Sequence, residues 1–418
     1  MKNILKKIIG MGMSGVIALS TVFVVASIPT TVSAHGERSQ EPFLRMRTVQ
    51  WYDVTWSKAT VAVNEQVVVK GKFRIAPDWP ASAAKPDVAF LNISTPGPVF
   101  VRKKTLINGV SATNSMGLKL GQDYEWEVHL KARHPGRWHI HSMLNVKDAG
   151  PIVGPGKYIE VTGDYADFKN EVTTLTGETV DLEHYGIKQA VMWHSLWAVI
   201  GVAWLLYWLA KPIFFARYPV AMSEDGDSLI TPTDKKVTAG FLVVALGLTF
   251  YGYMKAEADY PITLPLQAAM ANVDPLPQSE EQVKIKTETA TYRVPGRAMK
   301  ATITITNNTG QAIKLGEFNT ATVRFINPNV GIMDETAKGY PDYLLAQEGL
   351  TVENDRSIGP GETTTLSFIA QDAAWETERI SSLIYDPDSH FGGLLFFYGA
   401  DGTRYISNIH GSLIPKFI

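Results

Sequence analysis

Two uncharged apolar runs near the middle of the chain set the strongest limit on its fold. They cover residues 190–210 and residues 237–254. A helix needs about 20 apolar residues to cross a bilayer, and both runs are apolar on every side, unlike a helix that packs on one face of a soluble core. Trp and Tyr residues lie toward their ends, as in the interface belt of membrane proteins. The sequence therefore predicts two membrane-spanning helices, with buried core helices as the alternative.

The loop between the two runs, residues 211–236, is rich in basic side chains. These are Lys211, Arg217, Lys235 and Lys236. Lys and Arg in short loops mark the cytoplasmic side of a membrane, whereas acidic residues have little weight. The blocks on either side, residues 35–180 and 265–418, are therefore expected in the periplasm.

Residues 1–34 have the pattern of a secretory signal peptide. A positive start with Lys2, Lys6 and Lys7 precedes an apolar run over residues 8–28, and the segment closes on the small-residue site Val32-Ser33-Ala34. Cleavage after Ala34 makes His35 the first residue of the mature protein. That residue then offers an imidazole and an α-amine to one metal ion, and an amine with a pKa near 8 loses its proton to a transition metal at little cost.

The two flanking blocks alternate apolar and polar residues with the period of β-strands. Examples are residues 67–75, 124–131 and 301–306. Pro135-Gly136 predicts a hairpin turn into the next strand, and residues 394–402 predict a second hairpin. Many short strands separated by turns favour a β-sandwich in each block.

His139 and His141 form an H-x-H pair on one predicted strand. Residues i and i+2 of a strand project to the same face, about 7 Å apart at Cα. Alone, such a pair is typical of two solvated surface histidines. Together with His35, the pair supplies one amine and three imidazoles, an all-nitrogen set suited to copper.

The other candidate side chains have weaker claims. His129 and His134 are expected to be solvated, His184 and His194 to lie near the membrane, and His390 and His410 to be too isolated in sequence for a second cluster. The C-terminal block is therefore expected to bind no metal. Three carboxylates lie near the proposed copper and could orient a ligand histidine, although exposed carboxylates are the default. These are Glu37, Glu41 and Asp53, of which Glu37 is the preferred candidate.

The composition excludes several kinds of protein. The chain has no cysteine, so neither a disulfide nor a blue-copper site, which requires a thiolate, can form. Its net charge of −2 gives no indication of a nucleic-acid partner.

Long stretches of the mature chain resemble the large periplasm-facing subunit, the B-type chain, of the copper membrane monooxygenases, a family that includes particulate methane and ammonia monooxygenases. The matching stretches are residues 35–53, 87–92, 97–102, 135–141, 150–159, 174–183, 260–268, 292–299, 385–397 and 413–417. The resemblance implies a mainly β fold of two cupredoxin-like β-sandwich domains joined by a two-helix transmembrane hairpin. It also implies copper at His35, His139 and His141, and a bacterial inner or intracytoplasmic membrane. As partners, it implies two further membrane subunits of A and C type and an electron donor such as quinol. It also implies a trimer of three-chain units.

The implied function is that of a monooxygenase component that oxidises ammonia to hydroxylamine, or methane to methanol, with O₂. Methane-oxidising relatives commonly carry a histidine where this chain has Gln50, a poor copper ligand, so the sequence favours ammonia and argues against a second copper there. The C-terminal half is closer to the methane oxidisers. The resemblance leaves open whether oxidation occurs at this copper or at one held by a partner, so no catalytic residue is named. A periplasmic copper or electron carrier with a membrane anchor, and a purely structural scaffold, are the alternatives of another class.

Overall fold

The computed structural model describes residues 40–211, 214–223, 226–262, 269–277, 281–330, 337–386 and 388–417. The predicted signal peptide, His35 and Glu37 lie outside these residues. Contacts divide the chain into two units. One holds the residues up to Thr162 together with those from Met270 onward, and the other holds Gly163–Ala269.

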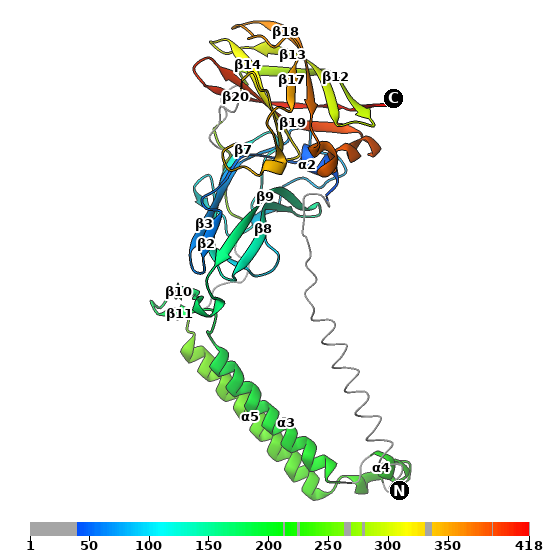
Figure 1. The fold of residues 1–418 in the computed structure, drawn as a ribbon. Helices are drawn as coiled ribbons and strands as arrows, with labels where there is room; N and C mark the ends of the chain where they lie inside the picture. Colours follow the sequence, from blue (N-terminus) through cyan, green and yellow to red (C-terminus); the bar gives the residue numbers. More distant parts are fainter. Residues whose placement is uncertain are drawn as a thin grey trace. The chain divides into compact units, whose positions relative to one another are not determined.

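The N-terminal part of the first unit is a sandwich of two sheets (Figure 1). One sheet has the order β1 (Val49–Trp56), β3 (Gln66–Ile75), β7 (Asp123–Ala132), β5 (Phe100–Ile107) and β6 (Val110–Ser111). The other has the order β2 (Thr60–Ala62), β9 (Gly150–Thr162), β8 (Gly136–Val146) and β4 (Ala89–Ser94). The predicted alternation is confirmed, because alternate residues of β3 and β7 are buried between the sheets.

The predicted hairpin at Pro135-Gly136 is wrong. β7 and β8 belong to different sheets, since β7 pairs with β3 and β5, and β8 pairs with β4 and β9. Proline and glycine indicate that the chain changes direction. They do not indicate which strand the next one joins, and here the chain crosses from one layer of the sandwich to the other.

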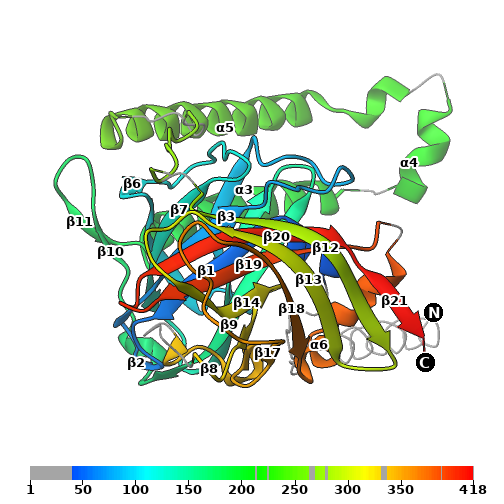
Figure 2. The same cartoon turned by 90° about the horizontal axis from the view of Figure 1, so that it is seen from above.

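The C-terminal part is a second sandwich (Figure 2). One sheet has the order β17 (Leu350–Val352), β18 (Thr363–Gln371), β13 (Ala298–Asn307), β12 (Val283–Val294) and β21 (Ile414–Phe417). The other has the order β16 (Leu345–Ala346), β15 (Val323–Ile326), β14 (Ile313–Thr320), β19 (His390–Gly399) and β20 (Arg404–Ser412). The predicted second hairpin is confirmed as β19 and β20, which pair from His390↔Ser412 to Tyr398↔Arg404. Short helices η5 (Asp342–Leu344), α6 (Ala374–Thr377) and η6 (Ile380–Tyr385) connect the strands.

The two sandwiches share one continuous hydrophobic core. A six-residue helix, α2 (Pro42–Arg47), leads into β1 and packs against β19 and η6 of the C-terminal sandwich. Its proline stands at the start of the helix, where a missing N–H costs nothing. Arg45 and Met46 of α2 are buried, so this helix fixes the C-terminal sandwich against the strands that follow it.

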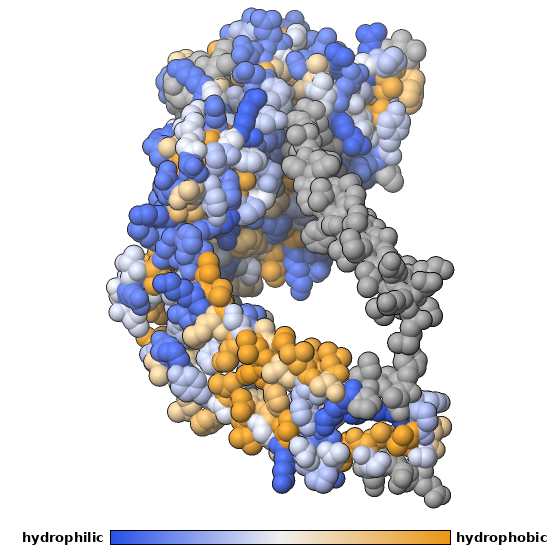
Figure 3. Space-filling model, turned by 60° about the horizontal axis from the view of Figure 1, so that its bottom comes forward, coloured by the Kyte–Doolittle hydropathy of each residue, from blue (hydrophilic) through white to orange (hydrophobic). Residues whose placement is uncertain are grey.

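The second unit is mainly helical. It contains η2 (Tyr165–Asp167), a hairpin of β10 (Glu171–Thr173) and β11 (Thr179–Asp181), α3 (Ile187–Leu209), α4 (Phe214–Ala221), η3 (Gly226–Leu229) and α5 (Pro232–Asp259). Both α3 and α5 are long and apolar enough to cross a membrane, by length and composition. Their side chains form an exposed apolar surface (Figure 3). The β10–β11 hairpin groups with these helices, whereas the sequence placed it in the N-terminal domain. A mainly β fold with two apolar helices between two sandwiches is confirmed.

Candidate metal centre

A β-bulge shapes the wall beside the H-x-H pair. His141 of β8 pairs with Gly156 of β9, and Met143 pairs with Val153. The intervening part of β9 therefore contains one residue more than that of β8, and the extra length falls at Gly154 and Pro155. Proline has no N–H to donate to a ladder, so it fits this irregularity. Bulges commonly redirect groups beside functional sites, and here the bulge brings the carbonyl of Gly154 toward His141.

The imidazoles of His139 and His141 lie against each other on the same face of β8, as the i, i+2 spacing predicts. Nδ1 of His139 is 3.0 Å from Nε2 of His141, and the ring planes are inclined at 79°. Only 8% of His139 and 4% of His141 is exposed. The alternative interpretation as two solvated surface histidines is therefore wrong.

The outer nitrogens of both rings have oxygen partners. The Tyr343 hydroxyl donates to the carbonyl oxygen of Gly156 at 2.8 Å, so its oxygen is available to accept from Nε2–H of His139 at 3.1 Å. Nδ1 of His141 lies 3.4 Å from the carbonyl oxygen of Gly154, an acceptor for Nδ1–H. This pattern assigns the unprotonated nitrogens to Nδ1 of His139 and Nε2 of His141, because a neutral imidazole carries one N–H.

Two unprotonated nitrogens that face each other at 3.0 Å fit a bound cation. Their lone pairs repel unless a positive charge lies between them. Nitrogens bound at about 2.0 to 2.1 Å to one transition metal ion are about 3 Å apart when they occupy neighbouring coordination positions. The donor set is all imidazole, which suits copper, zinc, iron and nickel.

The pocket around the two rings depends on residues that the sequence did not single out. A Cβ atom on Gly156 would lie 2.3 Å from Nδ1 of His141, so only glycine leaves room for the ring. Tyr158 stacks on His139 with ring centroids 4.4 Å apart. The guanidinium of Arg137 lies over the ring of Tyr158, 4.3 Å from its centroid. Gly156 and Tyr158 are the strand partners of His141 and His139, and the period-2 alternation of strands could have suggested that they share one face. No local signal points to Tyr343, which comes from the other sandwich.

Within the described residues, no group of three His, Cys, Asp or Glu side chains is placed to hold a metal ion. His139 and His141 therefore form a two-residue site in that part of the chain, and the third predicted ligand, His35, lies outside it. Glu37, the preferred carboxylate, also lies outside it. The chain enters the described part beside the bulge, because Gln40 donates to the Pro151 carbonyl and accepts from Val153 N–H at 2.8 Å.

The remaining candidates are exposed or have other contacts. Asp53 binds Arg404 of the C-terminal sandwich through two contacts of 2.7 and 2.5 Å, and Glu41 is exposed. His129 contacts Glu127, and His184 contacts Asp181. The other residues considered are His134, which lies in the link between β7 and β8, and His194, which contacts the Ala190 carbonyl in α3. Gln50 is buried, with Nε2 3.4 Å from the carbonyl oxygens of Met46 and Gly393.

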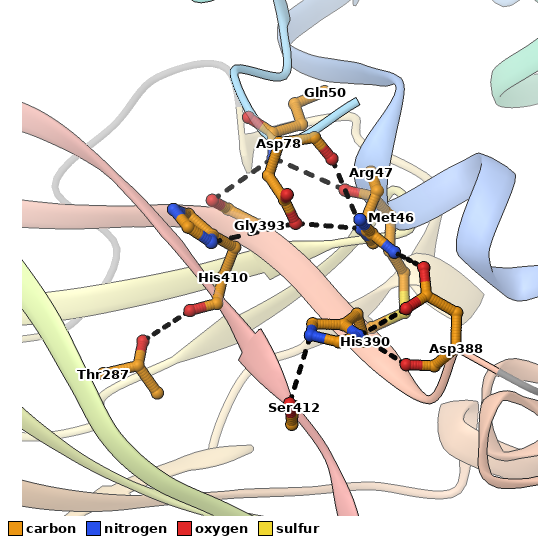
Figure 4. Close-up of polar contacts among 10 residues, drawn as sticks. All are labelled: Met46, Arg47, Gln50, Asp78, Thr287, Asp388, His390, Gly393, His410 and Ser412. Carbon is orange, nitrogen blue, oxygen red and sulfur yellow. Dashed lines mark hydrogen bonds and ion pairs between the residues drawn. The ribbon is translucent and has the colours of Figure 1, made fainter. Parts of the chain in front are cut away.

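His390 and His410, which the sequence reasoning treated as isolated, line one cavity of about 630 Å³ together with Asp78 (Figure 4). They lie on the neighbouring strands β19 and β20. His390 contacts Asp388 and Ser412, and Nδ1 of His410 is 3.7 Å from Asp78. Each histidine thus has a carboxylate beside it, and no third ligand completes a metal site among the described residues.

Comparison with known proteins finds relatives that match almost the whole chain. The Monooxygenase_B family model, which describes the B-type chain of monooxygenases, matches residues 36–417. The particulate methane monooxygenase alpha subunit of Methylococcus capsulatus is 49% identical over 401 residues, with 96% of each chain covered. Among solved structures, the cupredoxin domain of amoB from Nitrosocaldus yellowstonii matches 29% of this chain and 91% of its own length, at 18% identity and a TM-score of 0.24. A PapD-like domain of human CEP192 matches 37% of this chain and 98% of its own, at 9% identity and a TM-score of 0.17. On the family match and the 49% identical relative, this chain belongs to the Monooxygenase_B family, the B-type chains of membrane monooxygenases.

Proposed function

We propose that this chain is the copper-binding component of a membrane-bound monooxygenase and that His35, His139 and His141 hold the copper. The observation that carries the proposal is the pair of buried imidazoles, with Nδ1 and Nε2 3.0 Å apart and their outer nitrogens beside oxygen acceptors. Copper supplies one-electron redox chemistry and reactivity with O₂ at this position. The chain holds the ligand rings, sets their tautomers and shields them from water.

Chain length supports His35 as the third ligand. Gln40 is fixed on β9 at Pro151 and Val153, close in sequence to Gly156, the strand partner of His141. His35 precedes Gln40 by five residues, and an extended chain covers about 3.3 to 3.6 Å per residue. The mature N-terminus can therefore reach the pair. Glu37 would then lie beside the ligand histidine that it is proposed to orient.

We further propose that α3 and α5 cross a bacterial inner or intracytoplasmic membrane and that both sandwiches lie in the periplasm. The basic loop of residues 211–236 supports this orientation. The exposed apolar surface of α3 and α5 supports contacts with lipid and with two further membrane subunits of A and C type, three such units forming a trimer. The electron donor is proposed to be a quinol.

For the substrate we propose ammonia, with methane as the second candidate. Gln50, in place of the histidine common in methane-oxidising relatives, favours ammonia. The Methylococcus capsulatus relative favours methane, although it differs from this chain at about half of the aligned positions. Membranes that contain the complex are tested with ¹⁵N-ammonia and ¹³C-methane in competition. If labelled hydroxylamine forms at a lower concentration of its substrate than labelled methanol does, the result supports ammonia. The reverse order supports methane.

The copper site is tested by metal analysis and N-terminal sequencing of the purified complex. His139→Ala is expected to lower copper bound per complex and to change the Cu(II) EPR spectrum. His184→Ala is the matched control, because His184 is exposed on the helical unit and lies beside Asp181. A mature chain that does not begin at His35, or equal copper content and spectra in the two variants, contradicts the proposal.

A further inference from the structure

We infer that Tyr343, from the C-terminal sandwich, is a positioning residue for the metal centre: its hydroxyl fixes the tautomer of His139 that presents Nδ1 to copper. The inference rests on the proposed copper site and extends it across the two sandwiches. The C-terminal sandwich provides no proposed metal ligand, yet through this hydroxyl it controls one.

The direction of the hydrogen bonds follows from the number of protons. A tyrosine hydroxyl has one proton, and Tyr343 uses it to donate to the Gly156 carbonyl at 2.8 Å. Toward His139, 3.1 Å away, its oxygen is then an acceptor. Nε2 of His139 must therefore carry the N–H, and Nδ1 keeps its lone pair. Nδ1 is the atom that faces His141 at 3.0 Å.

The segment just before Tyr343 contacts both sandwiches. Lys157 of β9 donates to the Gly339 carbonyl at 2.6 Å. The Tyr340 hydroxyl donates to the Thr322 carbonyl at 2.7 Å, inside the C-terminal sandwich. We call residues 339–343 the clasp segment. It joins β9 of one sandwich to the core of the other beside the two imidazoles.

Loss of this hydroxyl has a specific chemical consequence. Without an acceptor at Nε2, the proton of His139 can move to Nδ1 and occupy the atom that should bind copper. Hydrogen-bond partners of metal-ligating histidines typically contribute about 10- to 100-fold to metal affinity. Because coupling between two sites is reciprocal, copper should in turn hold the clasp segment more tightly against β9.

The test is Tyr343→Phe in the intact membrane complex, with Tyr340→Phe as its matched control. Both changes remove a hydroxyl that donates to a backbone carbonyl, and only Tyr343 contacts His139. Tyr343→Phe should weaken copper binding by about 10-fold or more in competition with a chelator. It should also change the pulsed-EPR couplings of the non-coordinated imidazole nitrogen. Tyr340→Phe should leave both the affinity and the spectrum unchanged.

Hydrogen exchange provides a readout that does not depend on activity. The amides of Tyr340 and Leu344 donate to Ala337 and Pro341, and copper should slow their exchange in the wild type but not in Tyr343→Phe. Unchanged affinity and spectrum in Tyr343→Phe would overturn the inference, provided that His139→Ala loses copper. If His139→Ala keeps its copper, the proposed copper site itself is wrong, and the role of Tyr343 is rejected with it.

Discussion

Arg45 and Glu378 lie buried against each other, although 333 residues separate them in the sequence. Nη1 of Arg45 donates to the backbone carbonyl of Glu378 at 2.7 Å, and Nη2 lies 3.8 Å from its carboxylate. Nη2 also donates to the Ala321 carbonyl at 2.9 Å. The short helix α2 thus places a charged side chain inside the C-terminal sandwich, where two backbone carbonyls and one carboxylate receive it.

Arg45→Ala should strongly destabilise the contact between the sandwiches. Removing one partner of a buried ion pair leaves the other charge without compensation, which costs about 3 to 5 kcal/mol. The measurement is the thermal unfolding midpoint of the purified complex. Lys286→Ala is the control, because the Lys286–Glu288 pair is exposed and its loss should leave the midpoint unchanged. Equal midpoints for the two variants would show that the Arg45 pair does not hold the sandwiches together.

Gly156→Ala should displace the His141 ring and lower copper content. The added Cβ would lie 2.3 Å from Nδ1 of His141, a contact too short for the ring to stay in place. Gly310→Ala adds the same methyl group in open space and should bind copper like the wild type. Metal analysis of both complexes decides the matter, and full copper content in Gly156→Ala would contradict a role for His141 as a ligand.

Local regularities of the sequence predicted the strands, the two apolar helices and the relation of the two histidines. Alternation has a period of two residues, so it placed the side chains of β3 and β7 on their correct faces. The same period put His139 and His141 on one face, where the structure has them in contact. These predictions needed only residues within one strand.

Contacts between distant segments were beyond this reasoning. Tyr343 is 204 residues from His139, and no periodicity links the two. Asp53 pairs with Arg404, 351 residues later in the chain, and no spacing in the sequence predicts that contact. Which sheet β8 joins, and which surfaces of the two sandwiches meet, depend on packing of the whole unit. Such packing produces no regular spacing of residue types in the sequence.

Acidification should weaken the contact between Arg47 and Asp388 (Figure 4). The hydrogen bond from Arg47 lowers the pKa of the Asp388 carboxyl below its ordinary value. The unfolded chain therefore binds this proton at a higher pH than the folded chain. The resulting stabilisation is fully present above the ordinary pKa of about 4 and is lost as the pH falls through the folded-state value.

Thermal unfolding between pH 7 and pH 3 tests this dependence with Asp388→Asn. The wild type should unfold at a higher temperature than the variant at pH 7, and the difference should shrink below pH about 4. Asp148→Asn is the control, because Asp148 is exposed and its positive φ of 64° is one that asparagine also adopts readily. A difference between wild type and Asp388→Asn that stays constant down to pH 3 would rule out the stabilising role of this pair.

Asp234 should be needed to hold the loop end of the helical hairpin. One carboxylate oxygen accepts from the Thr231 backbone N–H at 2.8 Å, and the Thr231 hydroxyl oxygen accepts from the Asp234 backbone N–H at 3.2 Å; these two bonds form the capping box that begins α5. The other oxygen accepts from Tyr207 at 2.6 Å and from Lys211, at the end of α3. Only 1% of Asp234 is exposed. The sequence did not predict this role, because acidic residues in a short loop have little effect on the orientation of a protein in the membrane.

Asp234→Ala should loosen that end in two ways. It removes the side-chain half of the capping box, in which Asp234 accepts from the Thr231 N–H, and it leaves Lys211 without its buried carboxylate. Limited proteolysis of membrane vesicles that expose the loop should then cleave the variant faster than the wild type. Asp259→Ala is the matched control, because Asp259 lies at the other end of α5 in an exposed pair with Lys255. Faster cleavage in both variants would indicate general weakening of α5, whereas faster cleavage in Asp234→Ala alone assigns the effect to the link between α3 and α5.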